Sequence, residues 1–221
     1  GDALAFTQQL AGLCRQAGVT FHFETSVTSL VAGRNGVVAA RVADAAGSAG
    51  ELCGDAYLIA MGSHSAALAR TLGESLPIYP VKGYSVTLPL AADAEAPSVS
   101  ITDESRRIVC SHLGNRLRIA GTAELTGCDA SGNAGRCAAI LRRAQEIFPR
   151  VEPAGDVEYW AGLRPATPGN VPVIGRSRLD NLFYNTGHGT LGWTLACGSG
   201  QAVADIIGGR RPEIEFPFRA L

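Results

Sequence analysis

Hydrophobic residues recur with two different periods along this chain, and the change of period marks the predicted elements. In residues 3–17 the period is helical, with Asp2 in place to cap the helix and Gly18 to end it. The expected inward face of this helix consists of Phe6, Leu10, Leu13 and Ala17.

Alternating apolar and polar positions then predict a series of strands. Up to residue 60 the expected strands are 19–23, 27–31, 37–42 and 52–60. The dipeptide Asn35-Gly36 is a strong signal for a hairpin turn between the second and the third. The small residues of 45–50 indicate a loop, and Ser63 is expected to cap a short helix that ends near residue 72.

From Pro77 onward the pattern changes to a block of short strands with one helix. The helix is expected at 135–148, with Ile140, Ala144 and Ile147 facing inward. Many strands with a single helix favour an α+β unit with a largely antiparallel sheet. A further strand at 182–184 and a helix at 195–207 follow the block. The strands expected within the block are 78–81, 84–88, 98–102, 107–111, 116–121 and 157–163.

The elements on either side of this block can belong to one layer, with the block inserted between them. We therefore predict that residues 1–76 and 176–221 form one domain and that residues 77–175 form a second, α+β domain. This arrangement would bring the turn at 187–194 near the junction of the two domains, where ligand clefts often form.

The turn at 187–194 is the most informative stretch of the chain. It reads Gly187-His188-Gly189-Thr190-Leu191-Gly192-Trp193-Thr194, and it lies between an expected strand and an expected long helix. Strand, glycine turn and helix start together present free backbone N–H groups and the positive end of a helix dipole. Such a place suits a phosphate, a carboxylate or the electron-rich edge of a cofactor, and its glycines allow a close approach.

The same turn contains the pattern G-x-G-x-x-G, but we do not interpret it as a dinucleotide-binding fingerprint. That fingerprint needs a second parallel strand after the helix and an acidic residue about 20 positions further on. Asp205 has nearly the right spacing, but it falls inside the expected helix. Residues 208–221 contain two prolines and give no room for the strand.

Composition narrows the function classes. The chain has 221 residues, 46% of them hydrophobic, with a formal net charge of −1. The absence of a basic run argues against nucleic-acid binding, and no stretch reaches the roughly 18 apolar residues of a membrane span. Six cysteines form no C-x-x-C pair, so we expect reduced thiols in a cytoplasmic compartment and no metal site. The chain starts at a glycine and shows no secretory leader, so we expect a processed chain or a piece of a longer one.

Three side chains are candidates for chemistry. Arg164 ends an apolar strand before Pro165 and could hold a carboxylate through two hydrogen bonds, or could form an ordinary surface ion pair. His188 could serve as a base or a cofactor donor, or could hydrogen-bond the backbone of a tight turn. Tyr84 could point its hydroxyl into a cleft, or could be an ordinary strand residue. We expect Lys82 to be a solvated side chain. We expect Trp160 and Trp193 to be packing residues.

Four motifs, in order along the whole chain, resemble the C-terminal half of the FAD-dependent D-amino-acid oxidase and glycine oxidase superfamily. Within it, the chain is most similar to the small subunits of bacterial D-amino-acid dehydrogenases. The motifs are Ala60-Met61-Gly62-Ser63, Pro80-Val81-Lys82-Gly83-Tyr84-Ser85, Trp160-Ala161-Gly162-Leu163-Arg164-Pro165-Ala166-Thr167-Pro168 and Asn185-Thr186-Gly187-His188-Gly189-Thr190-Leu191-Gly192-Trp193-Thr194.

The resemblance implies a partial FAD-binding domain, Rossmann-like and of the GR2 type, with an inserted, mainly antiparallel β substrate-binding domain. It gives Arg164 the role of clamping the substrate carboxylate and Tyr84 a place in the wall of the active site. It implies that residues 187–194 face the pyrimidine end of the flavin, where a positive helix end would stabilise negative charge. Ala60, Met61 and Gly62 would lie beside the cofactor, and the backbone of Val27 would meet the adenine.

The implied reaction is hydride transfer from the α-carbon of a D-amino acid to FAD, followed by hydrolysis to a 2-oxo acid and ammonia. Electrons would pass to a quinone or another respiratory acceptor, which would place the protein in the cytoplasm or peripherally on the cytoplasmic face of the inner membrane. Family members carry the dinucleotide fingerprint in an N-terminal segment that this chain lacks. The resemblance therefore implies that the chain is one part of a longer polypeptide and binds FAD weakly or not at all alone.

Two other hypotheses remain open at this point. The fold could be a non-catalytic module that holds a carboxylate ligand at Arg164. Alternatively, the glycines of the turn could serve only tight packing, so that a bulky residue at Gly189 would lower stability without a separate effect on ligand binding.

Overall fold

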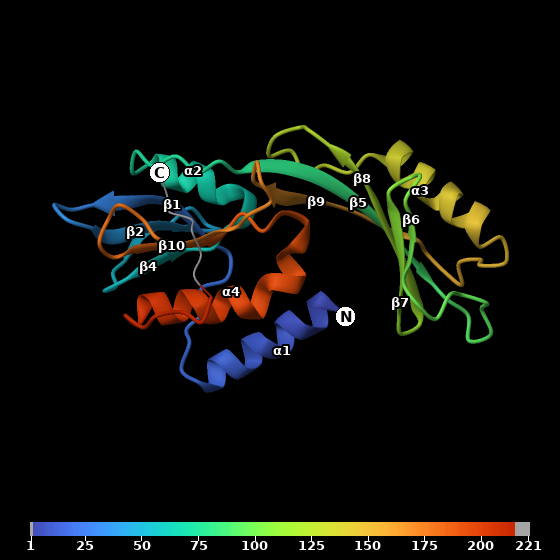
Figure 1. The fold of residues 1–221 in the computed structure, drawn as a ribbon, viewed down its shortest axis with the longest axis horizontal. Helices are drawn as coiled ribbons and strands as arrows, with labels where there is room; N and C mark the ends of the chain where they lie inside the picture. The colour runs from blue at the N-terminus through green and yellow to red at the C-terminus, as the bar shows by residue number, and fades with distance from the viewer. Residues whose placement is uncertain (1, 215–221) are drawn as a thin grey trace. The chain divides into compact units, whose positions relative to one another are not determined.

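The computed structural model describes residues 2–214 (Figure 1) and divides into two compact units. The inserted unit comprises Pro80–Arg164 together with Asp2. The outer unit comprises Ala3–Tyr79 and the chain from Pro165 onward. Residues 215–221 of the expected C-terminal segment lie outside the described residues.

The outer unit begins with helix α1 (Ala3–Gln16), followed by a three-stranded antiparallel sheet of β1 (Thr25–Ala32), β2 (Val37–Asp44) and β3 (Ala49–Leu52). The predicted hairpin is present, since Thr25 pairs with Asp44 at one end and Ala32 with Val37 at the other. Asn181 ties this hairpin to the rest of the unit, because its side chain accepts a hydrogen bond from the Val37 N–H and donates one to the Val37 carbonyl, both at 2.8 Å.

A second sheet of the outer unit joins chain segments from both sides of the insertion. Its strand order is β10 (Val173–Arg176), β11 (Leu182–Thr186) and β4 (Tyr57–Ile59). Strand β11 pairs parallel with β4, in the register Leu182 to Tyr57. The prediction that the segments before and after the insertion share one layer is therefore confirmed. Helix α2 (Ser65–Arg70) follows β4, and helix α4 (Gly192–Ile207) follows β11.

The inserted unit is a five-stranded sheet with one helix, α3 (Ala134–Ile147). Ile140 and Ala144 of α3 are buried against the sheet, and Ile147 packs partly buried beside them, as predicted. The core residues Tyr84, Val86 and Leu88 alternate along β5, as expected for a strand with one face toward the helix. The strand order is β6 (Ile101–Asp103), β7 (Ile108–Leu113), β8 (Arg116–Glu124), β5 (Tyr79–Pro89) and β9 (Glu158–Ala166).

The structure corrects several predicted elements. Residues 19–23 form no strand, because they pair with no other strand of the described chain, and Phe23 is 66% exposed. The expected strand 52–60 is divided between β3 and β4, which belong to different sheets. Conversely, the expected strands 78–81 and 84–88 are one continuous strand, β5. The short helix is preceded by a 3-10 turn at Gly62–His64, and no side chain caps it, so the expected cap by Ser63 is wrong.

The second expected domain boundary also differs. Strand β10, which the sequence analysis did not predict, pairs with β11 and therefore belongs to the outer unit. The return to the outer unit consequently begins at Pro165 and not after residue 175.

A buried carboxylate holds α2, β11 and the loop after β10 together in the outer unit. Glu74 is 2% exposed and accepts hydrogen bonds from the Tyr184 hydroxyl at 2.6 Å and the Ser177 hydroxyl at 2.7 Å. The Arg178 guanidinium lies 3.8 Å from the same carboxylate. Burial and Glu74 together raise the pKa of Tyr184 above its usual value, so this hydroxyl remains protonated and continues to donate.

We expect Glu74→Ala to lower the free energy of unfolding by about 1–3 kcal/mol, because it leaves the buried Tyr184 hydroxyl and the partly buried Ser177 hydroxyl without their acceptor. Urea unfolding of the protein measures this change. Glu146→Ala is the matched control, since Glu146 forms an exposed ion pair with Arg143 on α3 and should cost less than about 1 kcal/mol. Equal losses for the two variants would contradict the role given to Glu74.

Candidate functional site

The carboxyl ends of β4 and β11 bring two of the predicted site segments to one edge of the outer unit's parallel strand pair. Residues 60–62 follow β4 directly, and residues 187–194 follow β11 directly. Because paired parallel strands end at the same sheet edge, segments that are 125 residues apart in the sequence become neighbours. In open α/β sheets, this edge is where ligands bind.

A chain of hydrogen bonds fixes the two segments to each other. The Met61 N–H donates to the Ser65 hydroxyl at 3.1 Å, and the Ser65 and Thr186 hydroxyl oxygens lie 2.8 Å apart. The Thr186 hydroxyl in turn donates to the Gly62 carbonyl at 3.1 Å. Ser65 and Thr186 are almost completely buried, so these bonds are shielded from water.

The turn after β11 requires glycine at two positions. Gly187 and Gly189 have φ values of 75° and 54°, a region that side chains disfavour. A Cβ at Gly187 would also lie 2.8 Å from the Cγ2 atom of Thr167. Residues 189–191 form a 3-10 turn that leads into α4, and no side chain caps the start of α4. Residues 190, 191, 193 and 194 are exposed, so the turn is accessible in this chain.

Two polar atoms beside this turn are buried without a hydrogen-bond partner among the described residues. They are the Nε2 atom of His188 and the Oδ1 atom of Asn185. Buried polar atoms are seldom left unpaired in native structures, and an unpaired one often marks a missing ligand. Burial lowers the pKa of His188 below its usual 6.5, so the imidazole is neutral at pH 7.

Val27 and Met61 meet at a cavity of about 630 Å³ between β1 and α2. His64 lines the same cavity, although the sequence analysis assigned it no role. The signal that could have identified it is its position three residues after Met61. The other lining residues are Thr25, Ser26, Thr28, Ala67, Leu68 and Thr71. The structure therefore brings together Val27 and Met61, which lie 34 positions apart in the sequence.

Arg164 lies on β9 in the inserted unit, and its guanidinium forms no ion pair or hydrogen bond with the described residues. Burial lowers the pKa of its guanidinium below the usual 12.5. The guanidinium rests on Gly83 of the neighbouring strand β5, where a Cβ would lie only 1.9 Å from Nη1. Arg164 therefore does not form the surface ion pair that was the alternative interpretation of this residue.

Tyr84 and Lys82 enter a network on the opposite face of β5 from Gly83. The Tyr84 hydroxyl donates a hydrogen bond to Glu124, which also pairs with Arg136 at 3.4 Å. Tyr84 is 1% exposed, and its place in an active-site wall stays a prediction of the family resemblance. Lys82 is 3% exposed, so the expected solvated lysine is wrong.

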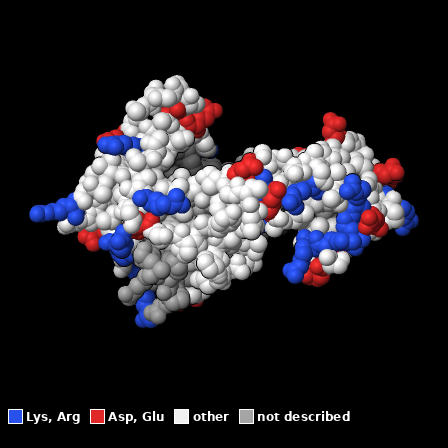
Figure 2. Space-filling model, turned by 90° about the horizontal axis from the view of Figure 1, so that it is seen from above, with Lys and Arg blue, Asp and Glu red and all other residues white. Residues whose placement is uncertain are grey.

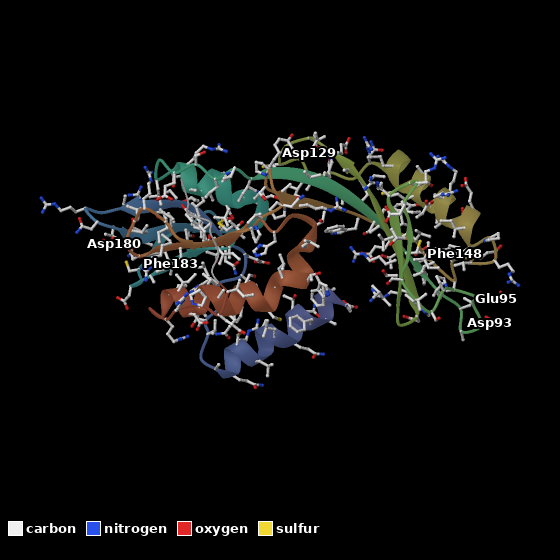
Figure 3. The ribbon with its side chains drawn as sticks, viewed as in Figure 1. Asp93, Glu95, Asp129, Phe148, Asp180 and Phe183 are labelled. Carbon is white, nitrogen blue, oxygen red and sulfur yellow. The ribbon has the colours of Figure 1, made fainter. Side chains whose placement is uncertain are left out.

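The Lys82 ammonium has three oxygen partners that compensate its burial. It lies 3.1 Å from Asp129, 3.4 Å from Glu124 and 3.2 Å from the Ser131 carbonyl. Burial opposes the charged form, but these partners, Asp129 foremost, keep the pKa of Lys82 above its usual 10.5. Asp129 lies in the loop between β8 and α3, where Figure 3 labels it. Hydrogen bonds from Ser131 and Lys82 lower the pKa of Asp129 to about 2.

The two tryptophans make packing contacts, as expected, but each is about half exposed. Trp160 is 51% exposed, and its indole ring lies over Gly162, where a Cβ would be 2.0 Å from the ring. The guanidinium of Arg118 lies 5.5 Å from the centre of the same ring. Trp193 is 48% exposed and meets Phe6 of α1 edge-on, with ring centres 5.4 Å apart.

Other kinds of site have less support in the described residues. No group of three or more His, Cys, Asp or Glu side chains within residues 2–214 could hold a metal ion. No helix of that range is long and apolar enough to cross a bilayer. Figure 2 shows basic and acidic side chains on the same face, with neutral residues between them.

We expect the partly buried His188, whose Nε2 atom is buried and has no hydrogen-bond partner among the described residues, to make stability depend on pH. Its pKa is lower in the folded protein than in the unfolded chain, so the stabilisation is present above pH 6.5 and is lost as the pH falls toward the folded value. Thermal unfolding between pH 7.5 and 5 should therefore show a smaller loss of stability in His188→Asn than in the unmodified protein. Parallel curves for the two proteins would contradict the burial of a neutral imidazole.

Comparison with known proteins identifies a matching family and two similar relatives. The model of the family described as "DAO: FAD dependent oxidoreductase" matches residues 1–206. The chain is 51% identical over 218 residues to the D-amino acid dehydrogenase of Dechloromonas aromatica, covering 99% of this chain and 52% of that protein. It is 46% identical to the D-amino acid dehydrogenase of Methylobacterium radiotolerans, covering 100% of this chain and 52% of that protein.

A solved structure has a similar fold. Glycine oxidase from Geobacillus kaustophilus superposes with a TM-score of 0.80 at 25% identity, covering 96% of this chain and 56% of the oxidase. The chain thus spans about half the length of the relatives it matches. The match of the family model across most of the sequence, together with these identities, assigns the chain to the DAO family of FAD-dependent oxidoreductases.

Proposed function

We propose that this chain is part of an enzyme that oxidatively deaminates D-amino acids to 2-oxo acids and ammonia with FAD. The observation that carries the proposal is Arg164, a half-buried guanidinium with no anionic partner among the described residues. A substrate carboxylate would supply that partner through two parallel hydrogen bonds. The relatives at 46–51% identity, both named D-amino acid dehydrogenase, support the substrate class.

The residues of the outer unit fit an FAD molecule. The unpaired Nε2 atom of His188 and the uncapped start of α4 lie where the flavin ring is expected, and both suit an electron-rich edge. The cavity beside Val27 and Met61 is large enough for an adenine. Residues 60–62 and 187–194 are joined at one sheet edge, which supports the expectation that they bind a single cofactor.

FAD, when bound, would supply the hydride acceptor for the substrate α-carbon. The chain's own residues act by binding and orientation. Arg164 would hold the carboxylate and so orient the Cα–H bond. The amides at the start of α4 would stabilise negative charge that develops on the acceptor side. His188, neutral at pH 7, can donate one hydrogen bond there without adding charge.

We also propose that an N-terminal half, absent from this chain, completes the FAD site and covers an exposed apolar surface of the outer unit. The surface includes Leu4 and Leu13 of α1, 67% and 61% exposed, and Phe23, 66% exposed. None of the described residues of α1 is buried, although its sequence is amphipathic. Large apolar side chains that are this exposed are consistent with an interface that another part of the protein covers.

The electron acceptor and the location follow from the same family resemblance. We propose a quinone or another respiratory electron carrier as acceptor, and a position in the cytoplasm or on the cytoplasmic face of the inner membrane. Reduction of the flavin by substrate, followed by reoxidation with a soluble quinone in place of oxygen, tests the first of these.

Arg164→Ala in the full-length, flavin-loaded protein should lower kcat/KM for D-alanine roughly 30-fold or more, as expected when one partner of a desolvated charge pair is removed. Arg164→Lys should recover part of the loss, because it restores the charge without the planar fork. Stopped-flow reduction of the flavin measures both effects. Arg142→Ala, an exposed arginine on α3, is the control and should leave the rate unchanged.

The outcome separates the enzyme from a non-catalytic carboxylate-binding module. A module would bind D-alanine in an Arg164-dependent manner without reducing a flavin. Retention of full activity in Arg164→Ala would overturn the role of Arg164.

The 221-residue chain alone should bind FAD weakly or not at all, because half of each matched relative lies outside it. Absorbance at flavin wavelengths after purification and gel filtration measures retention, with the full-length protein as the positive control. A yellow, stoichiometrically loaded 221-residue chain would contradict the proposed division of the site.

A further inference from the structure

The guanidinium of Arg164 occupies the space that a side chain at Gly83 would need. A Cβ at Gly83 would lie 1.9 Å from Nη1, 2.3 Å from Cζ and 2.3 Å from Nη2 of Arg164. Carbon atoms in contact are normally separated by about 3.5–4.0 Å. Since three atoms of the planar group are almost equally close, the guanidinium lies against the Cα of Gly83, between two neighbouring strands, β9 and β5.

The backbone conformation does not explain the glycine at this position. Gly83 is absent from the glycines with positive φ, so an alanine could adopt the same backbone geometry. The three atoms nearest to its Cβ would all belong to the far end of the flexible Arg164 side chain. We therefore attribute the absence of a side chain at Gly83 to the close approach of the Arg164 guanidinium.

The backbone at Gly83 is held firmly on both sides. Lys82 is anchored by Asp129 and Ser131, and Tyr84 by Glu124, all within the inserted unit. The pairing of β5 with β8 changes register here, since Lys82 pairs with Glu124 and Tyr84 with Gly121. Because successive residues of a strand point to opposite faces, this network lies on the face away from Arg164 and leaves the Gly83 face free for it.

The neighbouring positions of β9 restrict where the guanidinium could move. Trp160, Gly162 and Arg164 share one face of the strand, and the Trp160 indole fills the space above Gly162. A guanidinium displaced from Gly83 toward that side would have to move the indole, which also contacts the Arg118 guanidinium.

We propose that Gly83 is a positioning residue for substrate binding: its missing side chain forms the seat that sets where Arg164 presents its two parallel N–H donors. This inference rests on the proposed function, in which Arg164 binds the substrate carboxylate. The network around Lys82 and Tyr84 keeps the seat in place. A methyl group on the seat would lift the guanidinium while leaving its charge intact.

The test is Gly83→Ala in the full-length, flavin-loaded protein, combined with Arg164→Ala in a double-mutant cycle. Gly83→Ala should raise KM for D-alanine by about 10- to 100-fold, with a smaller change in kcat, because a misplaced binding group weakens capture of the substrate. In the Arg164→Ala background, the same substitution should change KM less than about twofold. Gly155→Ala is the matched control, since its Cβ would make only an ordinary 3.5 Å contact with Pro89.

Unfolding temperatures give a readout that does not depend on activity. If only the guanidinium opposes a Cβ at Gly83, the Gly83→Ala/Arg164→Ala double variant should be as stable as Arg164→Ala alone. This prediction holds even if Gly83→Ala by itself fails to fold, because removing the guanidinium should then restore folding.

The outcomes distinguish this inference from the proposed function. If Arg164→Ala loses substrate binding while Gly83→Ala keeps the original KM, Gly83 does not position Arg164. The role of Arg164 in binding the carboxylate is then retained. If neither variant alters binding or turnover of D-alanine, the proposed function itself fails. If Gly83→Ala destabilises the protein equally with and without the Arg164 guanidinium, the glycine serves the backbone and the inference is overturned.

Discussion

The parallel pairing of β4 with β11 is the constraint on which the rest of this structure depends. These strands come from opposite sides of a long insertion, and their pairing makes one unit of two chain segments. It also determines the position of the site, because both strands end at the same edge. The buried hydrogen bonds among Met61, Ser65, Thr186 and Gly62 then fix the two segments that leave that edge. The glycine turn after β11 is a local signal, and the long-range pairing of β11 with β4 brings it next to residues 60–62.

Two kinds of incompleteness characterise the chain, and they have different physical causes. His188 Nε2, Asn185 Oδ1 and the Arg164 guanidinium have no hydrogen-bond or ionic partner within residues 2–214. Several apolar residues of α1 and of 19–23, among them Leu4, Leu13 and Phe23, are more than half exposed. In the proposed function, a cofactor and a substrate supply the first kind of partner, and a further polypeptide half supplies the second.

Local sequence signals predicted much of this fold. The hairpin of β1 and β2, helices α1 and α3, and the glycine turn were all expected, because periodicity and turn chemistry act over a few residues. The roles predicted for Arg164 and for the 187–194 turn rest on the family resemblance, which four ordered motifs carry. Residues 19–23 have the alternation of a strand but no partner strand, so a local pattern alone gave the wrong answer there. Strand β10 was missed because its pairing with β11 is what makes it a strand.

Side-chain contacts between distant residues were beyond the reach of sequence reasoning. Nothing local indicates that Lys82 is buried, since its partner Asp129 is 47 positions away. Likewise, Gly83 resembles any strand glycine until β9 places the Arg164 guanidinium on it. The position of Arg164 relative to the 187–194 turn stays a prediction of the family resemblance.

The most direct test of the central claim is a crystal structure of the full-length, flavin-loaded protein with a bound carboxylate analogue of the substrate. The account predicts the flavin ring against residues 187–194 and the carboxylate on the Arg164 guanidinium, with that guanidinium still resting on Gly83. A flavin bound away from the carboxyl ends of β4 and β11, or an Arg164 paired with an acidic side chain in place of the ligand, would contradict it.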